Sequence, residues 1–161
     1  MFERTISCFT FSKSYAMTGW RLGYAVAPEP WMTGLRKATL YSSNGVSTPT
    51  QWAGVAALSI DTATLAQIRD QYRLRRDLLL SGLNEIGLPC EPPAGAFYAF
   101  PDVTRISKDS REAADIFLNR AQVATVPGTV FGAEGEGHLR FSFSTPIETI
   151  EAGLESLRRN L

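Results

Sequence analysis

The sequence predicts an α/β protein, in which short strands alternate with helices that cover them. One sign is the alternation over residues 138–144, where Leu139, Phe141 and Phe143 fall on one face and polar residues on the other, as in a strand with one buried side. A second sign is the stretch 61–87, whose apolar residues recur at multiples of three and four, the spacing of one helix face. Both periods in one chain favour helices packed on a sheet.

The first sixty residues contain signals for two short strands and two helices. Strands are expected over residues 5–9 and 23–27, and helices over residues 31–41 and 49–59. Turn-forming residues with the sequence S-S-N-G separate the two helices. Pro49 suits the first turn of the second helix, because no backbone N–H donor is needed there.

A long helix is expected between Asp61, which can accept hydrogen bonds as its N-cap, and Gly87, which can end it in a left-handed conformation. At ~1.5 Å per residue such a helix is about 40 Å long. A helix of that length can connect two lobes of a protein.

A second pattern begins after the prolines near residue 90. Strands are expected over residues 96–100, 122–126 and 138–144, and the glycine-rich residues 132–137 are expected to form a loop. Asp109 and Glu112 form a capping pair for a helix over residues 113–121. Thr145 and Glu148 resemble a capping box that starts the last helix.

The composition excludes several classes of protein. The 161 residues include 16 basic and 16 acidic side chains, so nothing suggests a nucleic-acid groove or a polybasic membrane patch. No apolar run approaches the ~20 residues of a membrane span. Two cysteines make no disulfide framework and fit a reducing compartment, so a cytoplasmic location is expected. With one histidine and no ligand cluster, no metal site is expected.

The chemistry of the chain is concentrated in residues 11–24. Lys13 follows the first predicted strand, and lysine is the side chain that forms a Schiff base with an aldehyde. Arg21 offers a planar fork of donors that suits a phosphate, and Thr10 can add a hydroxyl. An aldehyde and a phosphate on one small molecule describe pyridoxal phosphate.

A single lysine or arginine is by itself most often a solvated surface charge. Three aromatic residues, Tyr15, Trp20 and Tyr24, lie in the same segment, which contains few other charges. Two glycines bracket Arg21 and permit backbone conformations or close approaches that a side chain would block. We therefore expect these cations to be sheltered and not to lie on a plain solvated face.

The run F-S-K-S-Y-A-M-T-G-W-R-L-G-Y resembles the S-K-x(5)-G-x-R-x-G-Y signature of class I/II, fold-type I, PLP-dependent aminotransferases of the aspartate aminotransferase kind. The resemblance implies that Lys13 carries pyridoxal phosphate as a Schiff base and that Arg21 binds its phosphate. Thr10 stands where many members have a serine that also contacts the phosphate.

Arg140 is a second functional candidate. From spacing alone, an arginine on a solvent-facing strand surface is the favoured interpretation, and a bidentate clamp for a carboxylate is the alternative. The segment L-R-F-S-F-S resembles the family's L-R-x-S-F segment, which implies that Arg140 grips the substrate α-carboxylate.

Two further segments are similar to the family. P-A-G-A-F-Y resembles the P-x-G-x-F-Y/F turn, in which Gly95 either lets the backbone approach the substrate or simply enters a strand. P-G-T-V-F-G resembles the family's P-G-x-x-F-G loop, for which we expect structural support and no catalytic group.

The resemblance implies a fold in three parts, which correspond to the C-terminal portion of the PLP-dependent transferase fold. Residues 1–60 are expected to be a remnant of the large PLP-binding domain, 61–88 a long inter-domain helix, and 89–161 a small C-terminal α/β domain. Family residues expected upstream, such as the aspartate that pairs with the pyridine nitrogen, have no counterpart. The chain is therefore expected to need that missing part for activity.

The implied function is amino group transfer between an amino acid and a 2-oxo acid, by an intact enzyme that is a homodimer. Two alternatives stay open. One is a PLP-dependent lyase or synthase of the same fold, because Lys13 and Arg140 serve those reactions equally well. The other is a domain fragment that packs or binds without turnover.

Overall fold

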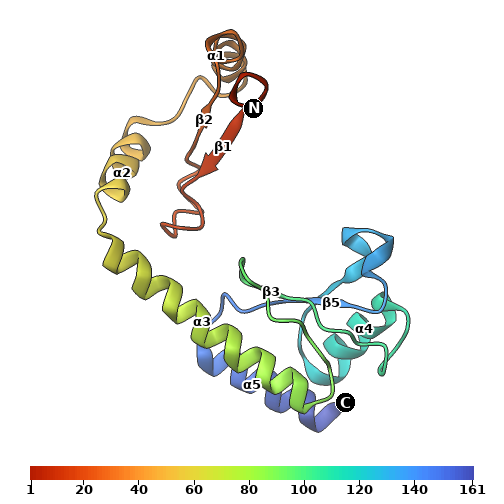
Figure 1. Ribbon diagram of the computed structural model, residues 1–161. Helices are drawn as coiled ribbons and strands as arrows, with labels where there is room; N and C mark the ends of the chain where they lie inside the picture. Colours follow the sequence, from red (N-terminus) through yellow and green to blue (C-terminus); the bar gives the residue numbers. More distant parts are fainter. The chain divides into compact units, whose positions relative to one another are not determined.

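The computed structural model describes all 161 residues, and the chain divides into two compact units, residues 1–67 and 68–161 (Figure 1). The boundary falls inside helix α3 (Thr62–Glu85). Both units combine helices with a small antiparallel sheet, in agreement with the predicted α/β class. No helix of the structure has both the length and the apolar character needed to cross a membrane.

The first unit contains one β-hairpin and two complete helices. After the short turn η1 (Phe2–Arg4), its elements are β1 (Ser7–Thr10), β2 (Gly23–Val26), α1 (Glu29–Ser43) and α2 (Thr48–Leu58). The first predicted strand is shifted by one or two residues, whereas the second and both helices agree to within two residues. Left-handed Asn44 and Gly45, with φ of +53° and +98°, end α1 where turn chemistry was predicted.

The two strands pair closely because of a glycine. β1 and β2 are antiparallel, with Thr10 opposite Gly23 and Phe9 opposite Tyr24. A Cβ at Gly23 would lie 2.6 Å from the carbonyl oxygen of Phe9, so any side chain there would push the strands apart. The Phe9 and Tyr24 rings stack with centroids 4.8 Å apart. The hairpin is thereby fixed in register at the end that carries the connecting loop.

The core of the first unit is small. Its buried apolar residues are Phe11, Met17 and Ala57. Larger side chains on the two helices are exposed, among them Tyr41 at 87% and Trp52 at 69%. A hairpin with so few buried residues is only marginally stable by itself. Because these large apolar side chains are exposed, residues 1–67 present a broad apolar surface.

Helix α3 begins and ends where the sequence predicts. The backbone N–H of Thr64 donates to Asp61 Oδ1 at 2.6 Å, so Asp61 caps the first turn. Gly87 is left-handed, with φ of +79°. The Leu88 N–H donates to the Leu83 carbonyl and the Gly87 N–H to the Asn84 carbonyl, both at 2.9 Å, which is the Schellman pattern.

The second unit is built on a three-stranded antiparallel sheet in the order β3-β5-β4. Its strands are β3 (Tyr98–Ala99), β4 (Val126–Pro127) and β5 (Leu139–Ser142). The central strand agrees with its prediction, but the two edge strands are much shorter than predicted. Left-handed Ala96, with φ of +61°, interrupts the first, and left-handed Gln122, with φ of +58°, serves as a helix cap before the second.

Helices α4 (Ser110–Ala121) and α5 (Ile147–Asn160) pack with the later turns of α3 around one core. From β5 and the residue after it, Leu139, Phe141 and Phe143 point into this core, so the predicted alternation is confirmed. The helices contribute the other large buried side chains, which include Leu83, Phe117, Leu154 and Leu157. The residues between them on β5, Arg140 and Ser142, point to the opposite face of the sheet.

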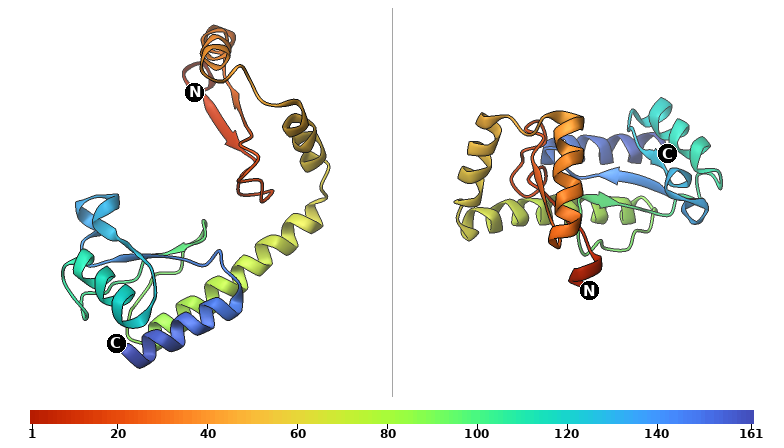
Figure 2. Two further views of the ribbon diagram at one scale, coloured as in Figure 1. Left: turned by 180° about the vertical axis from the view of Figure 1, so that it is seen from behind. Right: turned by 90° about the horizontal axis from the view of Figure 1, so that it is seen from above.

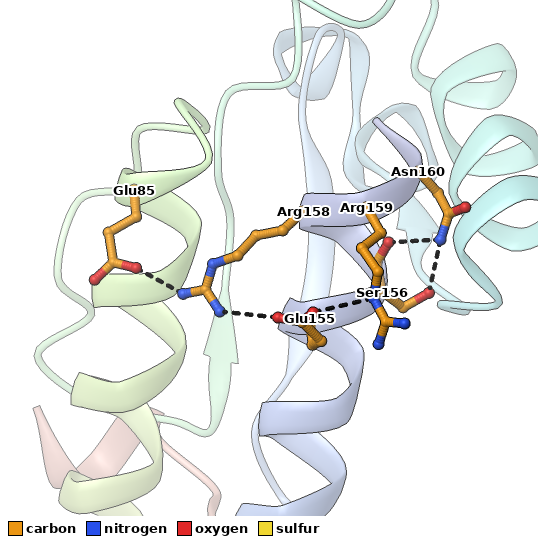
Figure 3. Close-up of polar contacts among 6 residues, drawn as sticks. All are labelled: Glu85, Glu155, Ser156, Arg158, Arg159 and Asn160. Carbon is orange, nitrogen blue, oxygen red and sulfur yellow. Dashed lines mark hydrogen bonds and ion pairs between the residues drawn. The ribbon is translucent and has the colours of Figure 1, made fainter.

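Helices α3 and α5 lie side by side, as the views of Figures 1 and 2 agree. A Cβ at Gly82 would lie 2.4 Å from Leu154 Cδ1, so the glycine lets the helices approach closely. At the edge of this contact Arg158 forms an ion pair with Glu85 at 2.6 Å and a longer one with Glu155 (Figure 3). Since these charged groups are partly exposed, buried packing and not the ion pairs holds the helices together.

The predicted caps of the last two helices have different outcomes. Asp109 accepts hydrogen bonds from the Arg111 and Glu112 N–H groups at 2.8 and 3.2 Å, so Asp109 is confirmed as the cap of α4. The Glu112 half of the predicted pair is not formed, because its carboxylate accepts the Ser107 hydroxyl proton and the Asp109 N–H donates to Ser107 Oγ. The capping box predicted for α5 is wrong. That helix begins at Ile147 with Pro146 as its N-cap, which leaves Thr145 one residue too early to cap it.

Candidate cofactor and substrate sites

The three residues predicted to hold the cofactor lie on one hairpin. Thr10 ends β1, and the connecting loop, residues 11–22, carries Lys13 and Arg21. The Phe11 N–H donates to the Leu22 carbonyl at 3.1 Å and closes the base of this loop. An amine, a guanidinium and a hydroxyl therefore come from a single local element.

The Thr10 hydroxyl is part of the turn that follows β1. Its oxygen accepts the Ser12 N–H at 3.1 Å, and its proton can go to Ser12 Oγ at 3.0 Å or to the Leu22 carbonyl at 3.4 Å. The hydroxyl therefore stabilises the loop conformation in which Lys13 follows directly.

Arg21 has an unusual backbone conformation. Its φ of +52° lies in the left-handed region, which residues with a Cβ seldom adopt. One guanidinium nitrogen, Nη1, donates to the Thr18 carbonyl at 3.0 Å, so the side chain folds back over its own loop. The remaining N–H groups of the fork can still serve a ligand.

Lys13 lies in a turn in which the Ala16 N–H donates to the Lys13 carbonyl at 3.3 Å. Both Lys13 and Arg21 are exposed, and the expectation that these cations are sheltered is wrong for this chain. The physical reason is the small core beneath them, which buries only Phe11 and Met17 of the loop. Among the aromatic rings of this hairpin, Phe9 stacks on Tyr24, and Phe11 packs against Tyr15 with centroids 5.3 Å apart.

The donor set fits an aldehyde that carries a phosphate. A primary amine is the group that condenses with an aldehyde, and a guanidinium with free donors binds phosphate oxygens in a bidentate manner. No group of three or more His, Cys, Asp and Glu side chains in the structure is placed to hold a metal ion.

Arg140 lies between two aromatic rings on the open face of the second unit's sheet. Its Cζ is 4.3 Å from the centroid of the Tyr98 ring and 4.8 Å from that of the Phe131 ring. The residue is half-buried, and none of the ion pairs of the chain involves it. A guanidinium without a carboxylate partner, packed between rings, differs from the plain solvent-facing arginine that spacing alone favours.

Gly95 lies in the connection that leads to β3. A Cβ built at this residue would meet nothing within 4 Å, and its φ is not in the left-handed region. The packing of the chain therefore does not require glycine at this place. The space beside it is open to a ligand or to another part of a protein.

Sequence reasoning did not assign a role to Phe131 beyond the support expected of its loop. It lies on η2 (Gly128–Phe131), which is followed by η3 (Ala133–Gly135). A Cβ at Gly128 would lie 1.9 Å from the Gly135 carbonyl oxygen, so the two turns touch through their backbones. In the sequence, the P-G-x-x-F-G pattern includes Phe131 and is the signal that could have pointed to a role for this ring.

Glu136 fastens the same loop to helix α4. Its Oε1 accepts the Ser110 N–H at 2.7 Å and the Gly137 N–H at 3.1 Å. The hydrogen bond from the Ser110 backbone and then that from Gly137 hold the pKa of the Glu136 carboxyl below its usual value. The Ser110 and Thr129 hydroxyls, 3.2 Å apart, add a second link between α4 and the loop.

We expect the substitution Glu136→Gln to lower the melting temperature near neutral pH, because the charge at the N-terminus of α4 is lost. A carboxyl with a lowered pKa in the folded state stabilises it above the unfolded-state pKa, and this contribution is lost as the pH falls through the folded value. The difference from wild type should therefore shrink below about pH 4. Thermal melts from neutral to acidic pH measure it.

Glu134→Gln is the matched control for that experiment, since Glu134 is an exposed carboxylate of the same loop that accepts no hydrogen bond. It should leave the melting temperature nearly unchanged at every pH. Equal melting curves for wild type and Glu136→Gln near neutral pH would contradict the role of Glu136.

Two cavities are lined by other residues. One of about 350 Å³ lies between α3 and α5 and includes Gly82 and Leu154 in its lining. The other, of about 390 Å³, lies beside α1 in the first unit and is lined mainly by apolar atoms, with Met32 and Leu35 among its walls. Neither cavity includes a predicted site residue.

The sequence pattern of the family "Aminotransferase class I and II" matches residues 2–157. Aromatic-amino-acid aminotransferase 2 of Thermococcus litoralis is 39% identical over 163 residues, which cover all of this chain and 42% of that protein. The aspartate/prephenate aminotransferase of Thermus thermophilus is 40% identical, with 99% of this chain and 41% of that protein covered.

Solved structures agree with the sequence comparisons. An aromatic aminotransferase from Pyrococcus horikoshii superposes with a TM-score of 0.93 at 40% identity, over 99% of this chain and 43% of that one. The aspartate aminotransferase from Thermus thermophilus with maleate superposes with a TM-score of 0.92 at 39% identity, over 99% and 42%.

The chain belongs to the class I and II aminotransferase family and has the α/β fold of its members. Proteins of this family generally depend on pyridoxal phosphate. The chain spans about two fifths of the length of the relatives that it matches.

Proposed function

We propose that this chain is part of a pyridoxal-phosphate-dependent aminotransferase, which moves an amino group between an amino acid and a 2-oxo acid. The observation that carries the proposal is the hairpin that presents Lys13, Arg21 and Thr10 together. Its amine, guanidinium and hydroxyl match the aldehyde and the phosphate of that cofactor, in a chain whose relatives are named aminotransferases.

Each hairpin residue has a separate role in the proposal. Lys13 would hold the cofactor through its amine, and when released it would move the proton at the substrate Cα. Arg21 would bind the phosphate through the N–H groups that Thr18 leaves free. Thr10 supports the turn and would add a hydroxyl beside the phosphate. The bound cofactor supplies the electron sink for the carbanion.

Arg140 would bind the α-carboxylate of the amino acid. Supporting this role is a guanidinium that is half-buried between two rings and has no acidic partner in the chain. The ion pair between the Arg140 guanidinium and the α-carboxylate would fix the orientation of the substrate, so that the reaction takes place at a bond to Cα. Gly95 would leave room for the substrate, because no atom of the chain occupies the space beside it.

The organisation of the complete enzyme is also a proposal. Residues 1–60 would belong to the large cofactor-binding domain, 61–88 would form the inter-domain helix, and 89–161 the small C-terminal domain. The chain would work as the C-terminal part of a cytoplasmic homodimer and would depend on upstream family residues. The broad apolar surface of residues 1–67 supports burial of that unit in a larger assembly.

A lyase or synthase reaction of the same fold is the alternative function, because it would use Lys13 and Arg140 equally. A ¹⁵N-labelled amino acid, aspartate or phenylalanine, supplied with pyridoxal phosphate separates the two. Sustained transamination requires a 2-oxo acid acceptor and moves the label onto it, whereas a lyase turns over repeatedly without an acceptor. We expect label transfer only with the acceptor, and little turnover from the 161-residue chain alone. A transaminase without an acceptor stops after one equivalent of product per cofactor, so product formed over many turnovers without an acceptor would overturn the assignment.

A further inference from the structure

We propose that Phe131 and Tyr98 are positioning residues for Arg140, which fix the plane of its guanidinium before a carboxylate binds. The inference deepens the proposed function and rests on the role given there to Arg140. The two rings come from different elements, β3 and η2, and both come within reach of Arg140 only in the folded unit.

The sheet register brings the first ring to the arginine. Tyr98 is paired with Ser142 on β5, so Arg140 is its diagonal neighbour on the same face of the sheet. The pairing places the guanidinium carbon 4.3 Å from the Tyr98 ring centroid. The third strand pairs Val126 with Arg140 and leads, two residues later, into the turn that carries Phe131.

The second ring also lies close to the guanidinium. The centroid of Phe131 is 4.8 Å from the same guanidinium carbon, so both rings lie within the range of a cation–π contact. A guanidinium held between rings keeps the N–H groups on its edge for a ligand, and a bidentate carboxylate binds in that plane. Restraining the side chain in advance reduces the entropy that binding would otherwise cost.

Phe131 is itself held in place by the structure. The Phe100 ring meets it edge-on with centroids 6.2 Å apart, and His138 stacks on Phe100 at 5.2 Å. The backbone contact between Gly128 and Gly135 and the links from α4 to Thr129 and Glu136 fix the loop beneath.

A purely structural role would place Phe131 in the core, but it is 52% exposed and is not part of the buried cluster of the unit. Its replacement should therefore leave the fold intact and act on Arg140. This difference makes the inference testable in the 161-residue chain itself, with the Arg140 side chain as the reporter.

The test follows the Arg140 side-chain resonances by NMR in the labelled chain, with sodium propionate as the carboxylate probe. Wild type should show upfield ring-current shifts at Arg140 Cδ protons, and propionate should shift the Nε–H signal. Phe131→Leu should lose much of the ring-current shift and raise the propionate Kd about three- to tenfold. Phe131→Tyr should keep both properties, and Tyr98→Leu should act as Phe131→Leu does.

Val130→Ala is the matched control, because Val130 is an exposed neighbour of Phe131 in the same turn. It should change neither the Arg140 signals nor the Kd. Equal propionate affinity in wild type and Phe131→Leu would overturn the positioning role while leaving Arg140 as a carboxylate site. No response of Arg140 to propionate in any variant would remove the carboxylate role, and the positioning role with it.

Discussion

Replacing Lys13 with alanine is expected to abolish covalent attachment of pyridoxal phosphate to the hairpin loop. Only an amine can condense with the aldehyde, and the alanine variant keeps Arg21 for the phosphate but has no amine on the hairpin loop. After borohydride reduction, the wild-type chain should carry the cofactor on the peptide that contains Lys13, and the variant should carry none there. Absorbance and peptide mass measure the result.

The chain offers two controls for this experiment, because its only other lysines are Lys37 and Lys108. Lys37→Ala should leave the adduct on Lys13 unchanged. Arg21→Gln should reduce the adduct at low cofactor concentration and recover at high concentration, since it weakens phosphate binding and leaves the amine. Equal labelling of all three lysines would mean unspecific reaction with surface amines, and the cofactor assignment would fail.

Replacing Phe117 with alanine is expected to lower the free energy of unfolding of the second unit by about 3–5 kcal/mol. The Phe117 ring on α4 is fully buried and meets the Phe141 ring of β5 edge-on, with centroids 5.9 Å apart. The substitution removes that contact and leaves a cavity where helix and sheet meet. Urea denaturation followed by circular dichroism in the far ultraviolet measures this loss of free energy of unfolding.

Leu118→Ala is the matched control, since Leu118 is the next residue of α4 and is 49% exposed. Leu118→Ala should lower the free energy of unfolding much less than Phe117→Ala does, because water already reaches about half of the Leu118 surface. Similar losses for both variants would contradict the packing of α4 against β5.

Features set by neighbouring residues could be predicted from the sequence. The Asp61 and Asp109 caps and the Gly87 stop of α3 depend on hydrogen bonds within a few residues, so the chemistry of each segment was sufficient. The burial of Leu139, Phe141 and Phe143 followed from a period of two. Thr145 shows the limit of such local predictions, because α5 begins one residue later than predicted and Thr145 is then no longer its N-cap.

Only part of the candidate site could be predicted from the sequence. Lys13, Arg21 and Thr10 were found by resemblance to a family signature, and their roles stay predictions. That they lie on one hairpin depends on the register between Thr10 and Gly23, which the sequence did not show. The exposure of Lys13 and Arg21 was mispredicted, because shelter depends on how much core lies beneath a loop and not on the aromatic residues within it.

The sequence by itself determined both ends of α3 and the buried face of β5, and it predicted the residues that would hold the cofactor, since each depends on the nature and spacing of nearby side chains. Tertiary structure alone decided that the edge strands are two residues long, that Gly128 touches Gly135, and that Phe131 covers Arg140. These contacts join segments that are distant in the chain or separated by turns. They exist only after a common core has brought the segments together, so no local pattern encodes them.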